Sequence, residues 1–194
     1  MPPAFPSPEP RMKMSRRIKV VLALGTLSSA VWASTYATFT DSATATSTFT
    51  AGTVDIVLNS DASDAYSFTT LQSSNLKPGD VIYAPLTVAN TGSLGFTYTM
   101  ASSSTNADAK SLRDTLTLGA KLVSSTCDAT TYAASVTTVI TEAAISGAAI
   151  GTPRGLAASA SEVLCFKASL PSNAADALQA STTTTTLTFN ATQS

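Results

Sequence analysis

The stretch LGFTYTMA, residues 94–101, decides the fold class. Every even position holds a large apolar side chain, and every odd position holds Gly, Thr or Ala. Side chains alternate between the two faces of a β-strand, so a period of two predicts a strand with one buried face. The same alternation recurs at residues 54–58, 82–88, 116–122 and 187–191, and a denser apolar run at 163–168 is typical of a central strand. We therefore predict an all-β fold, an antiparallel β-sandwich.

Turn-forming residues separate these stretches at three places, residues 77–80, 90–92 and 152–155. Two short helices are expected in addition. One lies around residues 106–114, and the other spans 172–180, where Ser172 or Asn173 is a candidate N-cap. Residues 128–160 are rich in Ala, Thr and Gly, and their pattern favours neither a helix nor a strand.

The composition removes several classes of enzyme. The 194 residues include 32 Thr, 27 Ser and 32 Ala, but no His, and charged residues make up only 12%. Without His, the Ser-His-Asp, Cys-His and HExxH chemistries are excluded. No glycine-rich phosphate-binding motif is present either. We therefore expect a protein that is not an enzyme and that needs no cofactor.

The N-terminus has the organisation of a secretory signal peptide. Five of the eleven basic residues fall within the first nineteen positions, and an apolar run at residues 18–32 follows them. This run is shorter than the roughly 20 residues of a membrane span, and a buried core helix is the alternative interpretation. Small residues permit cleavage after Ala37 or after Ala33. The segment before the basic cluster suggests that translation starts at Met12 or Met14.

The predicted export of the chain decides how its two cysteines are interpreted. Cys127 and Cys165 are an even pair in a chain bound for an oxidising compartment, which predicts a disulfide rather than a reactive or metal-binding thiol pair. Residues 38–194 carry six basic and eleven acidic residues, a net charge of −5. The sequence contains no basic patch of the kind that predicts nucleic-acid binding. We also expect no stable membrane span after cleavage.

The segment from residue 38 to residue 50 has an unusual two-sided pattern. Every even position carries a hydroxyl group. The odd positions carry Phe39, Asp41, Ala43, Ala45, Ser47 and Phe49. β-Branched Thr favours extended backbone, and such a strand has little to fold against alone. It can insert into a groove between the sheets of a neighbouring molecule, where backbone hydrogen bonds supply affinity and pockets for Phe39 and Phe49 supply the register. An ordinary edge strand and a flexible leader are the alternatives.

Several motifs in order resemble the TasA/camelysin family. TYATFTD at residues 35–41 and FTAGTVDI at residues 49–56 are similar to its signal-peptide junction and first strand. NLKPGD at 75–80 and NTGSL at 90–94 resemble its second motif pair, and LTFNATQ at 187–193 resembles its closing strand. Residues 101–180 match no motif of the family, and the cysteine pair is not part of its pattern.

The resemblance implies a jelly-roll sandwich, export through a SipW-type signal peptidase and assembly into extracellular fibres of a biofilm matrix. It favours cleavage between Ala37 and Thr38, which divides the chain into a leader (1–37), a donor strand (38–52) and a jelly-roll domain (53–194). In that family the N-terminal strand of one subunit completes the sheet of the next, which makes other copies of the chain its partners in a head-to-tail filament. The residues expected in the donor strand are Thr38, Phe39, Thr40, Asp41, Ala43, Ala45 and Phe49.

Two other functions compete with the fibre subunit. Camelysin has been described as a metalloprotease, which requires a metal ion and a base that activates water. The absence of His disfavours that activity. The alternative is a secreted adhesin or fibre-accessory protein that does not polymerise alone.

Overall fold

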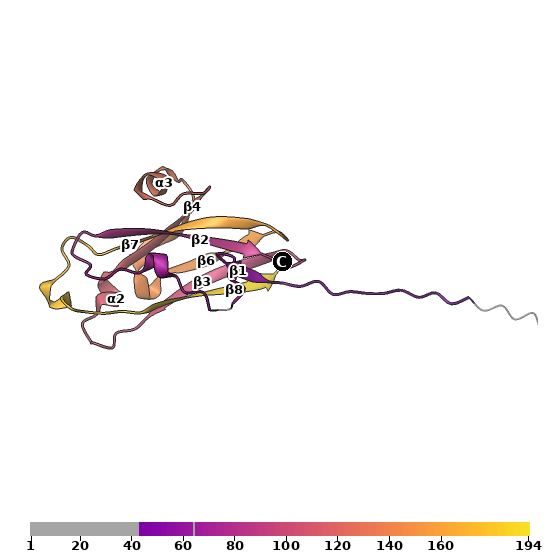
Figure 1. The fold of residues 1–194 in the computed structure, drawn as a ribbon, viewed down its shortest axis with the longest axis horizontal. Coiled ribbons are helices and arrows are strands. Elements are labelled where there is room, and N and C mark those ends of the chain that lie inside the picture. Colours follow the sequence, from indigo (N-terminus) through magenta and orange to yellow (C-terminus); the bar gives the residue numbers. More distant parts are fainter. Residues whose placement is uncertain (1–42, 64) are drawn as a thin grey trace, which may run out of the picture. The chain divides into compact units, whose positions relative to one another are not determined.

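A computed structural model describes residues 43–63 and 65–194 (Figure 1). The expected leader and the cleavage site between Ala37 and Thr38 lie outside the described residues. The same is true of four residues of the expected donor strand, Thr38, Phe39, Thr40 and Asp41.

The chain divides into two units, Met1–Phe49 and Thr50–Ser194. In the first unit, residues 43–49 belong to no helix or strand and their side chains are exposed. The second unit contains all the helices and strands of the described residues.

Eight strands of the second unit form two antiparallel sheets. Sheet A has the order β1 (Ile56–Leu58), β2 (Val81–Asn90), β7 (Ser161–Ser169), β4 (Thr117–Val123) and β5 (Thr138–Ala144). Sheet B has the order β6 (Ala149–Leu156), β3 (Phe96–Ser104) and β8 (Thr185–Gln193). The two sheets pack together as the predicted β-sandwich, with two short α-helices.

The core lies between the sheets and follows the alternation read from the sequence. Nine apolar side chains at even positions of β2, β3 and β7 are buried there: Ala84, Leu86, Val88, Phe96, Tyr98, Met100, Leu164, Phe166 and Ala168. Because these side chains come from both sheets, one hydrophobic cluster holds the two layers together.

The expected turn at residues 152–155 is wrong, because these residues lie inside β6. A proline interrupts strand pairing only where its missing N–H is needed. β6 is an edge strand, and its register on β3 shifts between Tyr98 and Met100. Pro153 therefore lies in an irregular part of an edge strand, where it is tolerated.

Both expected helices are longer in the prediction than in the structure. Residues 106–114 contain only the start of α2 (Leu112–Thr115), and 172–180 contain one turn of 3-10 helix, η3 (Asp176–Leu178), with no cap by Ser172 or Asn173. Short helices are marginal without packing. The second stretch folds instead as successive turns, including one from the Ala174 N–H to the Pro171 carbonyl.

The middle segment holds a helix that the sequence pattern did not assign. α3 (Ala129–Ala134) begins at Asp128, whose side chain accepts a hydrogen bond from the Thr131 N–H while the Thr131 hydroxyl accepts one from the Asp128 N–H. This reciprocal pair is a capping box. Asp at position 128 with Thr three residues later was a usable signal for the start of α3.

The strands are connected as in a jelly roll, with one strand position left vacant among the described residues. β5 and β6 are joined by the short turn η2 (Ile145–Gly147), so they lie on the same side of the sandwich. Counted from that side, β6, β3 and β8 of sheet B correspond to β5, β4 and β7 of sheet A. A jelly roll has eight strands shared by its two sheets. Strands β2 to β8 fill seven of these positions, four in sheet A and three in sheet B, and β1 is an additional strand at the edge of sheet A. The eighth position, beside β8 and opposite β2, is filled by no strand of the described residues.

Candidate functional site

The outer edge of β8 is a long strand edge with none of the usual protection against pairing. Residues 185–193 contain no Pro, no Gly and no charged side chain, and β8 pairs with β3 in one register without a bulge. Natural edge strands are commonly blunted by Pro, bulges or charges, as β6 is by Pro153 and its register shift. The β8 edge lacks all three features and is the more available of the two edges of sheet B.

The hydrogen bonds of β8 show which backbone groups face outward. The Ser194 N–H donates to the Gly95 carbonyl, and the Thr105 N–H donates to the Thr184 carbonyl. In an antiparallel pair such bonded residues alternate with residues whose N–H and C=O point the other way. The outward groups therefore belong to Thr185, Leu187, Phe189, Ala191 and Gln193. No hydrogen bond between described residues involves the N–H or C=O of these five.

The inward side chains beside this edge are incompletely covered. Leu187, Phe189 and Ala191 pack against the core cluster, yet each keeps part of its surface exposed. The Phe189 ring lies 6.1 Å from the ring of the buried Tyr98. A further strand beside β8 would cover these apolar groups and pair the outward backbone groups at once.

The chain between β1 and β2 adds apolar side chains to the core without forming a strand. It includes the 3-10 turn η1 (Thr69–Leu71), and the side chains of Tyr66, Phe68, Leu71 and Leu76 pack against the core. The Phe68 ring meets the Phe166 ring edge-on at 5.6 Å. These side chains fill part of the interior. Apart from local turns, the backbone of this segment bonds to Thr87 and Leu170, and none of its bonds reaches β8 among the described residues.

Residues 52–55 are clamped onto the turn between β2 and β3, and we call these contacts the clamp. The Thr53 N–H donates to Ser93 Oγ at 2.9 Å, and the Leu94 N–H donates to the Thr53 carbonyl at 3.1 Å. Two residues further on, Asp55 accepts two hydrogen bonds from Thr91. The Thr91 N–H donates to the Asp55 carbonyl at 3.0 Å, and the Thr91 hydroxyl donates to the Asp55 carboxylate at 2.5 Å. The clamp therefore fixes the point at which the N-terminal segment joins the sandwich.

Two glycines allow this close approach. A Cβ at position 92 would lie 2.4 Å from the Thr53 carbonyl oxygen, and a Cβ at position 52 would lie 2.5 Å from the Leu94 side chain. The turn is held from inside by Asn90, which is 1% exposed. Its Nδ2 donates to the carbonyls of Leu94, Leu156 and Ala157, and its Oδ1 accepts from the Gly92 N–H.

A half-buried ion pair links the two sheets. Arg154 of β6 donates through Nε and Nη2 to the two carboxylate oxygens of Glu162 of β7, at 2.9 and 2.5 Å, and the Tyr98 hydroxyl also donates to Glu162. Burial alone would raise the pKa of Glu162, but these hydrogen bonds outweigh it and hold that pKa below its ordinary value. Burial, followed by the bond to Glu162, raises the pKa of Tyr98. Each of these polar groups is satisfied by another, which indicates a structural role.

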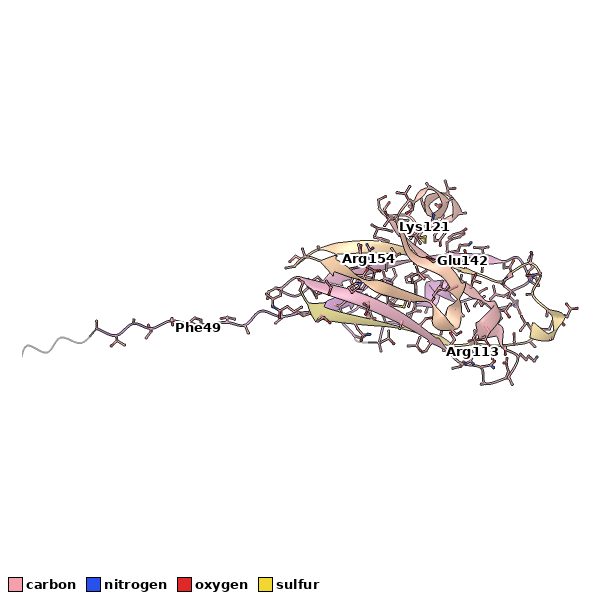
Figure 2. All side chains as sticks on the ribbon, turned by 180° about the vertical axis from the view of Figure 1, so that it is seen from behind. Phe49, Arg113, Lys121, Glu142 and Arg154 are labelled. Atoms are coloured by element: carbon pink, nitrogen blue, oxygen red, sulfur yellow. A yellow bond between two sulfur atoms is a disulfide. The ribbon has the colours of Figure 1, made fainter. Side chains whose placement is uncertain are left out.

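The outer face of sheet A carries the disulfide and a polar cluster. Cys127 and Cys165 are bonded, with their Cα atoms 5.2 Å apart, which ties the start of α3 to β7. Lys121 lies beneath this helix with Nζ 5.1 Å from the centre of the Tyr132 ring (Figure 2). Burial would raise the pKa of Glu142, but hydrogen bonds from Lys167, Thr117 and Ser169 lower it below the ordinary value.

The described residues contain no group that could bind a catalytic metal ion. No group of three His, Cys, Asp or Glu residues in the described ranges could hold a metal ion, and the whole sequence contains no His. A groove of about 740 Å³ lies along β5 and β6. Its lining is mostly Thr, Ala and Gly, and Arg154, which also lines it, is already bonded to Glu162. The donor set of a metalloenzyme is therefore not present in this part of the chain.

Five of the ten residues expected to be functional lie in the described ranges, and two of them are the bonded Cys127 and Cys165. Ala43, Ala45 and Phe49 of the expected donor strand are exposed, and the Phe49 side chain is 92% exposed (Figure 2). The edge of β8 and the clamp were not identified from the sequence as sites. Motifs 49–56 and 90–94, however, signalled the clamp, because they contain both of its sides.

No described helix is long and apolar enough to cross a membrane. A family model described as camelysin metallo-endopeptidase matches residues 13–194. No curated protein matches the chain.

Proposed function

The chain belongs to the camelysin family, and from this premise we propose that it is a structural subunit of an extracellular filament. In this proposal residues 38–50 of one copy add a strand to the outer edge of β8 in the next copy. The leader is removed by a signal peptidase after Ala37, which makes Thr38 the first residue of the mature, secreted chain. The disulfide supports this location, because such bonds persist in oxidising compartments.

The open edge of β8 is the observation that carries the proposal. Five residues present N–H and C=O groups to solvent along an uncharged strand, and apolar side chains beside them are half-covered. Strand addition satisfies both needs, because backbone bonds supply affinity and alternate side chains fill the interior. The nine residues of β8 require a partner of similar length, and residues 38–50 supply thirteen.

The pattern of residues 38–50 matches this edge. The odd positions place Phe49, Ala45 and Ala43 on the face that would turn toward Leu187 and Phe189, while the even positions carry hydroxyl groups for the solvent face. The contact joins two different surfaces of the same chain. Such a heterologous contact does not close by symmetry, so repetition yields a filament.

The description of the family as a metallo-endopeptidase does not fit the residues of this chain that the structure describes. Zinc peptidases bind their metal through His and carboxylate ligands, and the described residues provide neither such a group nor any His. We therefore assign no catalytic step to this chain.

The test is assembly of the purified mature chain, residues 38–194, followed by sedimentation and electron microscopy. We expect filaments from this chain and none from residues 51–194, which should stay folded because the sandwich unit begins at Thr50. A matched pair of double variants separates the two faces of the donor strand. Ala43→Asp with Ala45→Asp places charges toward the interior and should prevent assembly, whereas Thr44→Asp with Thr46→Asp places them toward solvent and should permit it.

Filaments from residues 51–194 would refute the proposal. A folded, mature chain that never polymerises alone would instead support the alternative, a secreted adhesin or accessory protein that joins a fibre built by another subunit.

A further inference from the structure

The clamp fixes the N-terminal segment at one particular end of β8. Thr53 bonds to Leu94, the next residue is Gly95, and Gly95 accepts the hydrogen bond of Ser194. The segment that leads into β1 accordingly lies at the end of β8 where the chain terminates (Figure 1). The opposite end of β8, at Thr185, is eight residue steps away, or roughly 27 Å at about 3.3 Å per residue.

This distance decides which strand can pair with β8 in the antiparallel direction. An antiparallel strand with its odd positions on the inward face of β8 must finish with Phe49 beside Thr185. The link from residue 50 to Thr53 has three steps and spans at most about 11 Å, far less than roughly 27 Å. The segment therefore cannot reach its own β8 edge in that direction as long as the clamp holds.

The parallel direction stays within reach of the same chain, because a parallel strand would end near Gln193. Parallel ladders are slightly less stable per residue than antiparallel ones. Residues 43–55 belong to no strand in the structure, although the clamp leaves this direction available.

We infer that the donated strand runs antiparallel to β8 and comes from a second copy, because the clamp keeps the segment from pairing with its own β8 in that direction. This inference rests on the proposed function and adds its direction and its cause. The partner is a second copy of this chain, and the residues that impose it are Thr53 and Asp55 on one side and Thr91 and Ser93 on the other. They are positioning residues, since they hold the root of the donated strand and do not form its pairing.

Linker insertion tests this inference directly. Fourteen Gly and Ser residues inserted between Thr50 and Ala51 give a link with a root-mean-square span of about 23 Å, close to the distance that an antiparallel self-pairing requires. A two-residue insertion is the matched control, because its five steps reach only about 18 Å. Self-pairing then competes at an effective concentration of about 1 mM, roughly 100-fold above a 10 µM solution of the protein.

We expect the fourteen-residue variant to remain monomeric at concentrations about 100-fold above those at which the control polymerises, and to unfold at a higher temperature than residues 51–194. Filaments from both insertion variants at the same concentration would overturn the inference. That result would leave the proposed function intact as long as the unmodified chain polymerises and residues 51–194 do not. Failure of the unmodified chain to polymerise would instead refute the proposed function.

A cross-linking measurement reads the direction of the strand independently. Thr48→Cys, near the end of the donated segment, is combined with Thr186→Cys or with Thr192→Cys, at the two ends of the exposed face of β8. In filaments treated with a short bismaleimide, we expect covalent dimers for the Thr186 pair and few for the Thr192 pair. The reverse result would show parallel donation and overturn the inference.

Discussion

Replacing Ala191 by proline should block assembly without unfolding the subunit. Ala191 lies opposite Tyr98 in the β3–β8 register, so its N–H points to the open edge and not to β3. Proline is tolerated on an edge strand where the N–H faces solvent. The substitution therefore removes one group that the donated strand needs, while the bonds between β8 and β3 remain.

The size of the effect follows from the lost bond. A backbone hydrogen bond contributes a net 0.5–1.5 kcal/mol, and leaving its acceptor buried without a partner costs about 1–3 kcal/mol. A loss of about 2 kcal/mol per contact corresponds to about 30-fold in the association constant. The critical concentration for filament growth, measured by sedimentation of equilibrated samples, should rise by about that factor. The urea midpoint of the monomer should change little.

The neighbouring position supplies the control for this prediction. The Thr192 N–H belongs to the set that bonds to β3, so Thr192→Pro removes a ladder bond and should destabilise the sandwich by about 3 kcal/mol. An unchanged critical concentration in the Ala191→Pro variant would show that the β8 edge is not where subunits join. Equal destabilisation by both prolines would show that the assignment of inward and outward groups is wrong.

Further predictions concern the sandwich itself. Replacing both Cys127 and Cys165 by Ser should lower the free energy of unfolding by about 4 kcal/mol, the chain-entropy value for a separation of 38 residues, in urea titrations without reductant. Gly92→Ala should cost about 2 kcal/mol because its Cβ meets the Thr53 carbonyl, whereas Gly151→Ala, which has open space around it, should cost little in the same thermal melts. Folding lowers the pKa of Glu162 below its ordinary value of 4.5. Its contribution to the free energy of unfolding is therefore fully present above pH 4.5 and is lost as pH falls through the lowered pKa. Glu162→Gln should flatten this dependence of stability on acid pH. Addition of EDTA should change neither the melting temperature nor filament formation, because the described residues lack a metal-binding group.

The period of two predicted most of the fold because burial in a sandwich is decided strand by strand. A strand of a sandwich needs one apolar face in contact with the other sheet. The spacing of Phe96, Tyr98 and Met100 shows that face directly in the sequence. Features that depend on specific hydrogen bonds or on strand register were harder to predict from the sequence. The capping box at Asp128 depends on two residues, and the tolerance of Pro153 depends on a register shift that arises from pairing with β3.

The clamp and the open edge could be predicted only in part, for a physical reason. Gly52 and Gly92 are visible as motif residues, but the need for them comes from distant parts of the chain, the Leu94 side chain for Gly52 and the backbone of Thr53 and Asp55 for Gly92. The edge of β8 is defined by the absence of a neighbour, which follows from strand order rather than from its own sequence. The alternation at 187–191 reads the same whether β8 is central or at an edge.

An open, uncharged edge raises the question of why two β8 strands would not simply pair with each other. Such a pair would satisfy backbone groups on both strands, and its twofold symmetry would close the assembly at a dimer. It would join the sheets edge to edge, however, and bring no new side chain over Leu187 and Phe189. A donated strand brings Phe49, which is 92% exposed before assembly, and burial of a Phe side chain contributes about 1.5–3 kcal/mol. That difference favours the donated strand by about 10- to 150-fold. In the proposed assembly, the aromatic residues of the donor segment, more than its hydroxyl face, would therefore favour the filament over the dimer.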